Sequence, residues 1–311
     1  MSVATVLKTL GSPLDGRLSS PGATPPPLAN PHTCNSTAHL TDDDILALWD
    51  KNQLLNTQDY PAAHSQVRLI TPDTVAKRSE RLRGDLADAC PVEAFALTVI
   101  AEHTRIPAPR LHRVVRRPEK GDCLTVMDRV PGKQLSILWP MMTEPERDKI
   151  VKLMADYVRQ LRALDIPNVR VPGPLDKDMR PRKCMRSPVL GPVVTSHSPW
   201  ASYDELGEFF ARRRNKLRDD SLPHMDTTYP LVLTHHDLSP RNFVFDSGPG
   251  ILWMIDWADC GVYPEWWEAL SVERRAENED ASWRDVVKRA CGDYPAVREW
   301  RNKIAPAFYC R

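Results

Sequence analysis

The sequence has no long apolar run and almost no net charge. No segment approaches the roughly 20 apolar residues that a membrane-spanning helix needs. Its 42 basic and 41 acidic residues leave a formal charge of +1, which argues against general attraction to nucleic acid or to a membrane surface. The opening residues, MSVATVLKTLGSPLDG, lack the charged start and apolar block of a secretory signal. We therefore expect a cytoplasmic protein that binds neither nucleic acid polymers nor membranes.

Closely spaced cysteines and clustered glycines are also missing. The seven cysteines are an odd number and are scattered along the chain, which favours reduced thiols over a disulfide framework or a zinc site. Glycine accounts for 13 of 311 residues, and residues 56–70 contain none. A glycine-rich loop that covers a phosphate is therefore not encoded there.

The chain divides by composition. Residues 1–38 are rich in Pro, Ser and Thr and predict a disordered leader. The folded region is expected to begin with a helix in TDDDILALW, residues 41–49, which has acidic residues in its first turn. A longer helix is predicted from Thr143, where Glu146 completes a capping box. Its apolar residues recur at steps of three and four: Ile150, Leu153, Met154, Tyr157, Val158 and Leu161.

The stretch HHDLSPRNFVFDSGPGILWMIDW, residues 235–257, carries the strongest chemical signal. Asp237 is followed five residues later by Asn242, and Asp256 comes after a further apolar segment. This order fits phosphoryl transfer, in which the first carboxylate accepts a proton from the attacking hydroxyl. The amide and the second carboxylate then supply oxygen ligands to Mg²⁺, which takes its other ligands from water and substrate phosphates.

Residues 243–246 and 251–255 predict a hairpin, because both runs are apolar and Ser, Gly, Pro and Gly separate them. A turn centred on Pro249 would place Asn242 opposite Asp256, with Cβ atoms roughly 4.5 to 5.5 Å apart. Alternation would direct a set of apolar side chains to the other face: Phe243, Phe245, Trp253 and Ile255.

A second set of charged residues lies upstream. TVAKR, residues 74–78, predicts a strand with Val75 and Lys77 on one face. Residues 91–104 predict a helix in which Glu93 shares its face with apolar residues. A buried carboxylate needs a partner, and Lys77 is the nearest candidate in sequence. Taken singly, Glu93 is explained as a first-turn acid, Lys77 as a solvated side chain and each Asp as a turn former.

Together these segments resemble the aminoglycoside phosphotransferase and choline kinase-like superfamily, especially its fungal-type phosphotransferase members. The matching segments run from about residue 74 to residue 268: VAKR, VEAFALTVIAEHTRIPAPRL, LTVMDRVPGKQL, ADYVRQLRAL, LTHHDLSPRN and MIDWADCGVYPEWWE. The resemblance implies an α+β, bilobal protein kinase-like fold. Residues 39–130 would form a small lobe with an antiparallel sheet and one key helix, and residues 131–311 a larger, mainly helical lobe.

The resemblance also implies the cofactors and the roles of individual residues. ATP and Mg²⁺ would serve a kinase whose acceptor is a hydroxyl group of a small molecule. Asp237 resembles the catalytic base, and Asn242 and Asp256 resemble the metal ligands. Lys77 resembles the phosphate anchor and Glu93 its ion-pair partner, while residues 127–130 resemble the hinge that binds adenine. The nucleotide contacts implied are Val75, Lys77, Glu93, Met127, Asp128 and Val130.

Two features depart from the family pattern. His236 stands where members keep glycine, and the region before Lys77 lacks a glycine-rich loop. A catalytically impaired binding or scaffolding protein with this fold therefore stays an alternative. A protein kinase is disfavoured, because no Ala-Pro-Glu segment follows Asp256.

The acceptor and the oligomeric state do not follow from the sequence. Basic residues between residues 166 and 200 would suit an anionic acceptor but are better explained as a solvated loop: Lys177, Arg180, Arg182, Lys183 and Arg186. Acidic residues further on would suit a cation but are better explained as helix surface: Glu265, Glu268, Glu273, Glu277, Glu279 and Asp280. Trp266 and Trp267, beside Tyr263, are expected in the core.

Overall fold

The structure is a computed structural model. It describes residues 36–52, 66–79, 90–164, 171–174, 182–184, 187–191, 199–275 and 282–308. The predicted leader therefore lies outside the described residues up to position 35. The chain divides into two compact units. Unit 1 comprises residues 1–79, 97–150 and 240–255, and unit 2 comprises residues 80–96, 151–239 and 256–311. The predicted lobe boundary at residue 130 stays a prediction.

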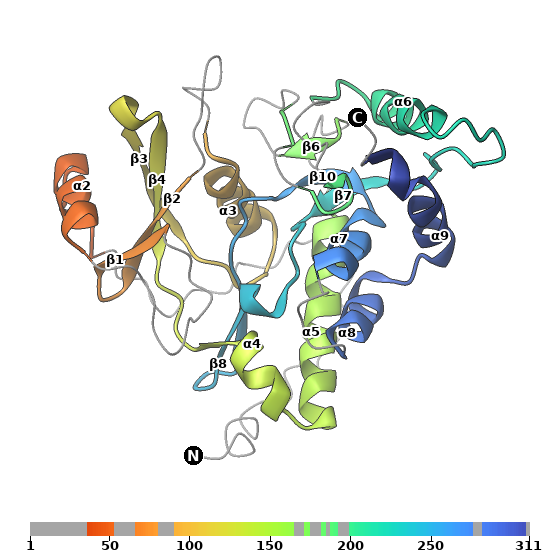
Figure 1. Ribbon diagram of the computed structural model, residues 1–311. Coiled ribbons are helices and arrows are strands. Elements are labelled where there is room, and N and C mark those ends of the chain that lie inside the picture. Colours follow the sequence, from red (N-terminus) through yellow and green to blue (C-terminus); the bar gives the residue numbers. More distant parts are fainter. Residues whose placement is uncertain are drawn as a thin grey trace. The chain divides into compact units, whose positions relative to one another are not determined.

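Unit 1 contains a four-stranded antiparallel sheet in the order β1-β2-β4-β3 (Figure 1). The strands are β1 (Val67–Thr71), β2 (Thr74–Arg78), β3 (Leu111–Arg117) and β4 (Asp122–Asp128), with a 3-10 turn, η2 (Pro118–Lys120), between the last two. β2 confirms the strand predicted for TVAKR.

Helix α2 (Asp42–Lys51) packs against one face of this sheet. Thr41 caps it, and Asp44 returns the hydrogen bond in a capping box. The helix predicted within residues 41–49 is confirmed. Ile45 and Trp49 of the helix meet Ala76 and Val126 of the sheet. Because side chains alternate along a strand, Val75, Lys77 and Met127 lie on the opposite face. The prediction that Val75 and Lys77 lie on the same face of the strand is confirmed.

Helix α3 (Val92–His103) confirms the helix expected over residues 91–104. It begins in unit 2 and continues into unit 1. Helix α5 (Glu144–Arg162) likewise confirms the long helix expected after Thr143. The Thr143 backbone N–H donates to the Glu146 carboxylate at 2.7 Å. Pro91 for α3, the Thr143–Glu146 pattern for α5 and apolar periodicity in both therefore predicted these helices.

A second sheet in unit 1 contains the predicted hairpin. Its order is β5-β8-β9, with β5 (Lys133–Gln134), β8 (Phe243–Asp246) and β9 (Ile251–Met254). Helix α4 (Leu135–Leu138) and the 3-10 turn η3 (Trp139–Met141) follow β5, and the 3-10 turn η5 (Pro240–Asn242) precedes β8.

The expected hairpin register was wrong by one residue. The register pairs Phe243 with Met254 and Val244 with Trp253, so the turn is centred between Gly248 and Pro249. Asn242 consequently faces Ile255, whose N–H donates to the Asn242 carbonyl at 2.9 Å. Trp253 also shares a face with Val244, not with Phe243 and Phe245 as expected. Both faces are buried, which is why apolar alternation did not reveal the register.

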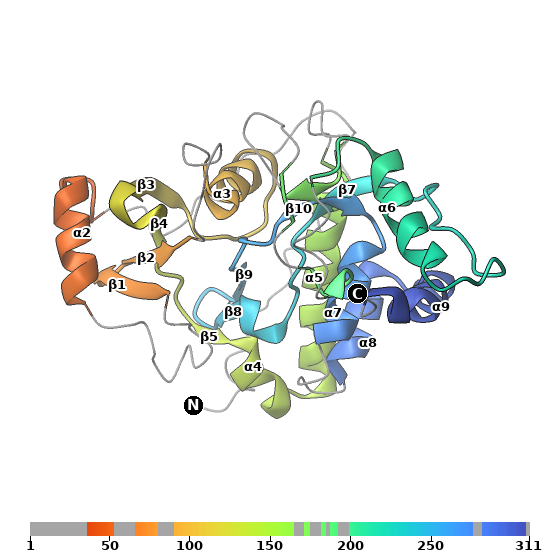
Figure 2. The same ribbon diagram turned by 45° about the horizontal axis from the view of Figure 1, so that its top comes forward.

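Unit 2 combines a small sheet with helices. The sheet has the order β6-β10-β7, with β6 (Gly173–Pro174), β7 (Leu231–Thr234) and β10 (Gly261–Pro264). The helices after β6 are α6 (Tyr203–Asn215), α7 (Trp267–Arg275), α8 (Ser282–Cys291), α9 (Pro295–Ile304) and a terminal 3-10 turn, η7 (Ala305–Phe308). Helices α7 and α8 pack side by side (Figure 2).

The core of unit 2 is strongly aromatic. Trp266 and Trp267 are 1% and 0% exposed, and Tyr263 stacks on Trp267 with ring centroids 4.8 Å apart. The expectation that they fill the core is confirmed. Other members of this cluster come from α6, α9 and η7: Phe209, Phe210, Trp300 and Phe308. This packing holds β10 and α7 together within unit 2.

Among the residues that the structure describes, no helix combines the length and apolar character needed to cross a lipid bilayer. The five cysteines within the described ranges are free thiols, as their spacing predicted: Cys90, Cys123, Cys184, Cys260 and Cys291.

Candidate active site

The loop with the predicted catalytic base follows β7 directly. Thr234 ends the strand, and His235, His236 and Asp237 are 0%, 0% and 5% exposed. A buried loop must satisfy its backbone groups internally. Its hydrogen bonds therefore identify the residues that hold Asp237 in place.

Glu268, on α7, provides the main anchor for this loop. Its Oε2 accepts the backbone N–H of His235 at 2.6 Å and that of His236 at 3.1 Å. Its other oxygen, Oε1, has no hydrogen-bond partner within the described part of the chain. Burial raises the pKa of the Glu268 carboxyl to about 7, although the two backbone N–H groups oppose this shift.

The expectation that Glu268 belongs to the helix surface was wrong, since the residue is only 2% exposed. Its immediate neighbours in sequence gave a usable signal. Trp266 and Trp267 precede it and Ala269 and Leu270 follow it, so Glu268 stands within a run of apolar residues. A carboxylate within such a run is buried and needs partners.

Asp237 is held by further hydrogen bonds of its own loop. The Ser239 hydroxyl donates to Asp237 Oδ1 at 2.5 Å, and the Asp237 N–H donates to His235 Nδ1 at 3.3 Å. The indole N–H of Trp283 donates to the Leu238 carbonyl at 2.9 Å. The carboxylate is thus oriented before any substrate binds, which is what a general base requires. Ser239 was not predicted from the sequence.

His236 occupies a backbone conformation that favours glycine, with φ of 72°. Its ring lies against Tyr263, and the Trp267 indole N–H lies 3.0 Å from Nε2. Because an indole N–H only donates, Nε2 accepts and the ring proton resides on Nδ1, 3.3 Å from the Asp259 carbonyl. The imidazole therefore packs with the aromatic core of unit 2.

Glu93 is buried, as predicted, at 5% exposure. Its Oε1 accepts the backbone N–H of Trp257 at 3.2 Å, and Trp257 directly follows Asp256. Asp256 has φ of 65°, a conformation that Asp tolerates better than most residues. Glu93 thus fixes the backbone next to the predicted metal ligand. Its pairing with Lys77 stays a prediction.

Unit 1 contains the other predicted site residues. Val75 and Met127 are buried on the face of the sheet that also presents Lys77. Val130 packs against Val244 and Trp253 of the second sheet. Asn242 is 3% exposed and ends the turn η5. The set divides between unit 1, with Val75, Lys77, Met127, Asp128, Val130 and Asn242, and unit 2, with Glu93, Asp237 and Asp256.

The donor chemistry of the predicted metal ligands suits Mg²⁺. Asn242 and Asp256 offer an amide oxygen and a carboxylate oxygen, and Mg²⁺ prefers oxygen ligands. The described residues contain no group of three or more His, Cys, Asp and Glu side chains that would hold a metal by themselves. An ion that takes its remaining ligands from water and nucleotide phosphates needs no such group.

Other residues near the site have structural explanations. Burial raises the pKa of the Cys260 thiol well above its usual range, so this cysteine is a packed and unreactive group. Arg182 is 6% exposed and donates to the Cys90 carbonyl at 3.0 Å, so it is not a solvated loop residue. Glu273 pairs with Arg298. Lys183 is exposed and Glu265 is half-buried. The other six candidates for contact with the acceptor lie outside the described ranges: Lys177, Arg180, Arg186, Glu277, Glu279 and Asp280.

The chain is similar to a known protein family and to several solved structures. Residues 61–300 match the model of the phosphotransferase enzyme family. No curated protein matches the sequence. The structure is similar to that of the GDP and kanamycin complex of APH(2")-IIia, with 14% identity, 86% of this chain and 88% of the other covered, and a TM-score of 0.51.

Two further solved structures have lower TM-scores. The streptomycin-ATP-APH(2")-IIa ternary complex is 15% identical, with 85% and 86% of the two chains covered and a TM-score of 0.47. An aminoglycoside-3'-phosphotransferase of type VIII is 16% identical, with 87% and 99% covered and a TM-score of 0.45. The fold is α+β and kinase-like, as the sequence resemblance implied.

Proposed function

Because the chain belongs to the phosphotransferase enzyme family, we propose that it transfers the γ-phosphoryl group of ATP to a hydroxyl group of a small molecule. The match over residues 61–300 carries this proposal, because it includes every residue predicted to act in the reaction. The anchoring of the Asp237 loop by Glu268 supports it independently, since a general base must be held in position.

Asp237 is the base in this proposal. Its carboxylate orients the acceptor hydroxyl and takes up its proton as the oxygen attacks the γ-phosphorus. The new bond joins the acceptor oxygen to phosphorus, and the bond between the γ-phosphorus and the bridging oxygen breaks. The products are a phosphate ester and ADP. Ser239, which donates to Oδ1, restricts the orientation of this carboxylate.

Four further residues act at the ATP phosphates in this proposal: Lys77, Glu93, Asn242 and Asp256. Lys77 would steady the α- and β-phosphates, with Glu93 as its partner. Asn242 and Asp256 would hold Mg²⁺, which supplies positive charge against the phosphate oxygens when it is bound. The hydrogen bond from Trp257 to Glu93 supports this arrangement, because it fixes the backbone immediately after Asp256.

In this proposal the adenine base of ATP binds to residues of unit 1. Met127, Asp128 and Val130 lie at and just after the end of β4, and Val75 pairs with Met127 across the sheet. The buried apolar side chains of Val75 and Met127 suit contact with a planar base.

Two alternative functions make different predictions. In a protein kinase, an activation segment would follow the second Asp, but here β10 already begins at Gly261. A catalytically impaired binding protein was suggested by His236 and by the glycine-free region before Lys77. The His236 ring packs against Tyr263 and Trp267, whereas residues 53–65 of that region lie outside the described residues. The position of β10 therefore argues against a protein kinase, and a substrate screen separates a small-molecule kinase from a binding protein.

A substrate screen tests the proposal. The purified protein would be incubated with ATP, Mg²⁺ and a library of hydroxyl-containing metabolites that includes aminoglycosides, and each reaction would be examined by mass spectrometry for added phosphoryl groups. We expect at least one product that the Asp237→Asn variant does not form. ATP binding without any phosphorylated product, across amines, sugars and secondary metabolites, would instead support the binding-protein alternative.

A further inference from the structure

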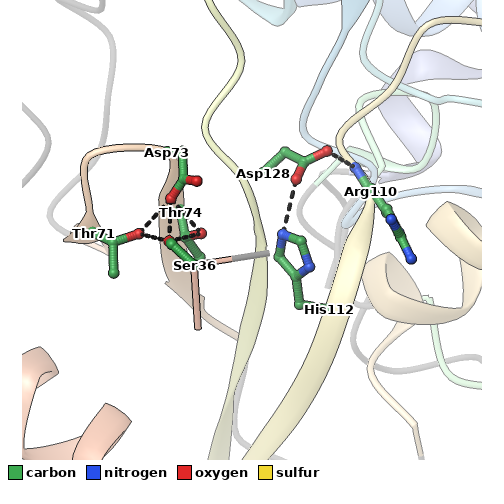
Figure 3. Close-up of polar contacts among 7 residues, drawn as sticks. All are labelled: Ser36, Thr71, Asp73, Thr74, Arg110, His112 and Asp128. Atoms are coloured by element: carbon green, nitrogen blue, oxygen red, sulfur yellow. Dashed lines mark hydrogen bonds and ion pairs between the residues drawn. The ribbon is translucent and has the colours of Figure 1, made fainter. Parts of the chain in front are cut away.

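Asp128, in the segment assigned to the nucleotide base, is held by two residues of the neighbouring strand region. Its Oδ1 accepts the ring Nε2–H of His112 at 2.8 Å, and its Oδ2 accepts the backbone N–H of Arg110 at 3.0 Å (Figure 3). The Asp128 N–H in turn donates to the Arg110 carbonyl at 3.1 Å. Three hydrogen bonds therefore fix both the side chain and the backbone of Asp128.

His112 reaches Asp128 because of an irregularity in β3. The register pairs Leu111 with Met127 and Arg113 with Val126, so His112 is an extra residue without a partner in the ladder. Such a residue re-aims its side chain relative to the normal alternation. The imidazole is only 2% exposed and the Asp128 side chain 8%. The bond between them is thus shielded from water, which strengthens it.

Arg129, the next residue, is held by the turn between β1 and β2. The Arg129 N–H donates to the Asp73 carbonyl at 2.8 Å, and its guanidinium donates to the Pro72 carbonyl at 3.2 Å. The Asp73 side chain is itself the acceptor of Ser36, Thr71 and Thr74 hydroxyls (Figure 3). Hydrogen bonds from the Ser36 and Thr71 hydroxyls lower the pKa of the Asp73 carboxyl, so it is ionised at neutral pH.

These contacts hold two consecutive peptide units of the predicted hinge. Base recognition through a backbone segment depends on the exact position of its N–H and C=O groups, because hydrogen bonds weaken steeply with misalignment. Nothing in the reaction itself requires an imidazole at position 112, which lies on β3 and outside the set of residues expected to contact the phosphates. Its contribution is therefore transmitted through Asp128.

We propose that His112 is a positioning residue for nucleotide binding, which acts by fixing Asp128 and thereby sets the affinity for the base but not for the phosphates. This inference rests on the proposed function, since it assumes that residues 127–130 receive the base. The inference predicts that loss of His112 lowers the affinity for the base and leaves the affinity for the phosphates unchanged. These two affinities can be measured separately.

The test compares three variants of the full chain. His112→Leu removes the donor to Asp128, whereas His112→Gln keeps an N–H donor on a side chain of similar reach. His103→Leu is the matched control, because this histidine also belongs to unit 1 but is 57% exposed. Titration calorimetry measures the Kd of ATP with Mg²⁺ for each protein, and displacement of ATP measures the Kd of inorganic tripolyphosphate, which has no base.

We expect His112→Leu to weaken ATP binding roughly tenfold, the effect of losing one buried hydrogen bond. Tripolyphosphate should bind this variant as it binds the wild type, and His112→Gln and His103→Leu should bind ATP normally. Should His112→Leu prove unfolded by circular dichroism, Asp128→Asn supplies the measurement, with the same selective weakening expected.

Three results would overturn the inference. One is unchanged ATP affinity in His112→Leu, and another is equal weakening of ATP and tripolyphosphate. The third is a His112→Gln variant that binds ATP as weakly as His112→Leu. A wild-type protein that binds no ATP would refute the proposed function and this inference together, so the two failures are distinguishable.

Discussion

The carboxylate of Glu268 lies 2.6 Å from the backbone nitrogen of His235, although 33 residues separate the two in sequence. The same oxygen accepts the N–H of His236, so one buried side chain holds the loop that carries Asp237. Its burial raises the pKa of Glu268 to about 7, within the range of ordinary assay conditions. The stability of the protein should therefore depend on the protonation of this one group.

The first prediction concerns stability against pH. Burial raises the Glu268 pKa from 4.5 to about 7, so between these values the folded protein keeps a proton that the unfolded chain has lost. The unfolded state then binds fewer protons, and the free energy of unfolding falls as pH rises through this window, by up to about 3 kcal/mol. At pH values below and above this window, Glu268 does not change the free energy of unfolding further.

Urea unfolding between pH 5 and pH 8 measures this contribution. Glu268→Gln keeps an oxygen that accepts the two N–H groups but does not titrate, so its stability should lose the part of the slope that Glu268 causes. Glu265→Gln serves as a control for an acid of the same segment that is not fully buried. Parallel pH profiles for wild type and Glu268→Gln would contradict the assignment.

The second prediction concerns the catalytic base. Asp237→Ala should lower turnover by roughly 100- to 10,000-fold, the range for loss of general base catalysis, and should leave nucleotide binding largely intact. Steady-state kinetics with an acceptor found in the screen and calorimetry with ATP measure the two effects. Asp285→Asn, which removes an exposed carboxylate from α8, should behave as wild type. Near-normal turnover of Asp237→Ala would exclude Asp237 as the base.

The third prediction concerns the metal ligand. Asp256→Ala should weaken nucleotide binding in the presence of Mg²⁺, because a carboxylate oxygen ligand is lost. The Asp256→Ala isotherm should approach that of the wild type measured in EDTA. Asp256→Asn tolerates the positive φ and keeps an amide oxygen but loses the negative charge, so it should weaken binding less. An isotherm with Mg²⁺ that neither substitution changes would argue against Asp256 as a ligand.

The fourth prediction concerns the backbone that follows the predicted hinge. Gly132 has φ of 112°, and a Cβ atom there would lie 2.4 Å from the Phe245 carbonyl oxygen. Gly132→Ala should therefore combine backbone strain with a clash against a strand of the second sheet, and should destabilise the protein by about 2 kcal/mol or more. Thermal unfolding measures this loss of stability. Gly248→Ala is the control, because its Cβ would meet an ordinary contact of 3.6 Å. Equal melting temperatures for the two variants would contradict this explanation.

Local sequence patterns predicted the elements of the candidate site well. Thr74–Arg78, the helix with Glu93 and both strands of the 243–254 hairpin appear where strand formers, helix periodicity and turn residues placed them. The hydrogen bond from the Thr143 backbone N–H to the Glu146 carboxylate at the start of α5 was also predictable. These features depend on residues near in sequence, whose backbone preferences and capping hydrogen bonds act within a few positions.

The sequence by itself determined several helices and strands that carry candidate site residues, the family resemblance and the order of those residues along the chain. Only the tertiary structure decided that Glu268 is an anchor and not helix surface, that His236 packs into an aromatic core, and that Asn242 faces Ile255. It also revealed the contact between His112 and Asp128. The physical reason is that burial, register and hydrogen-bond partners depend on which distant segments pack together, and a local pattern does not encode that packing.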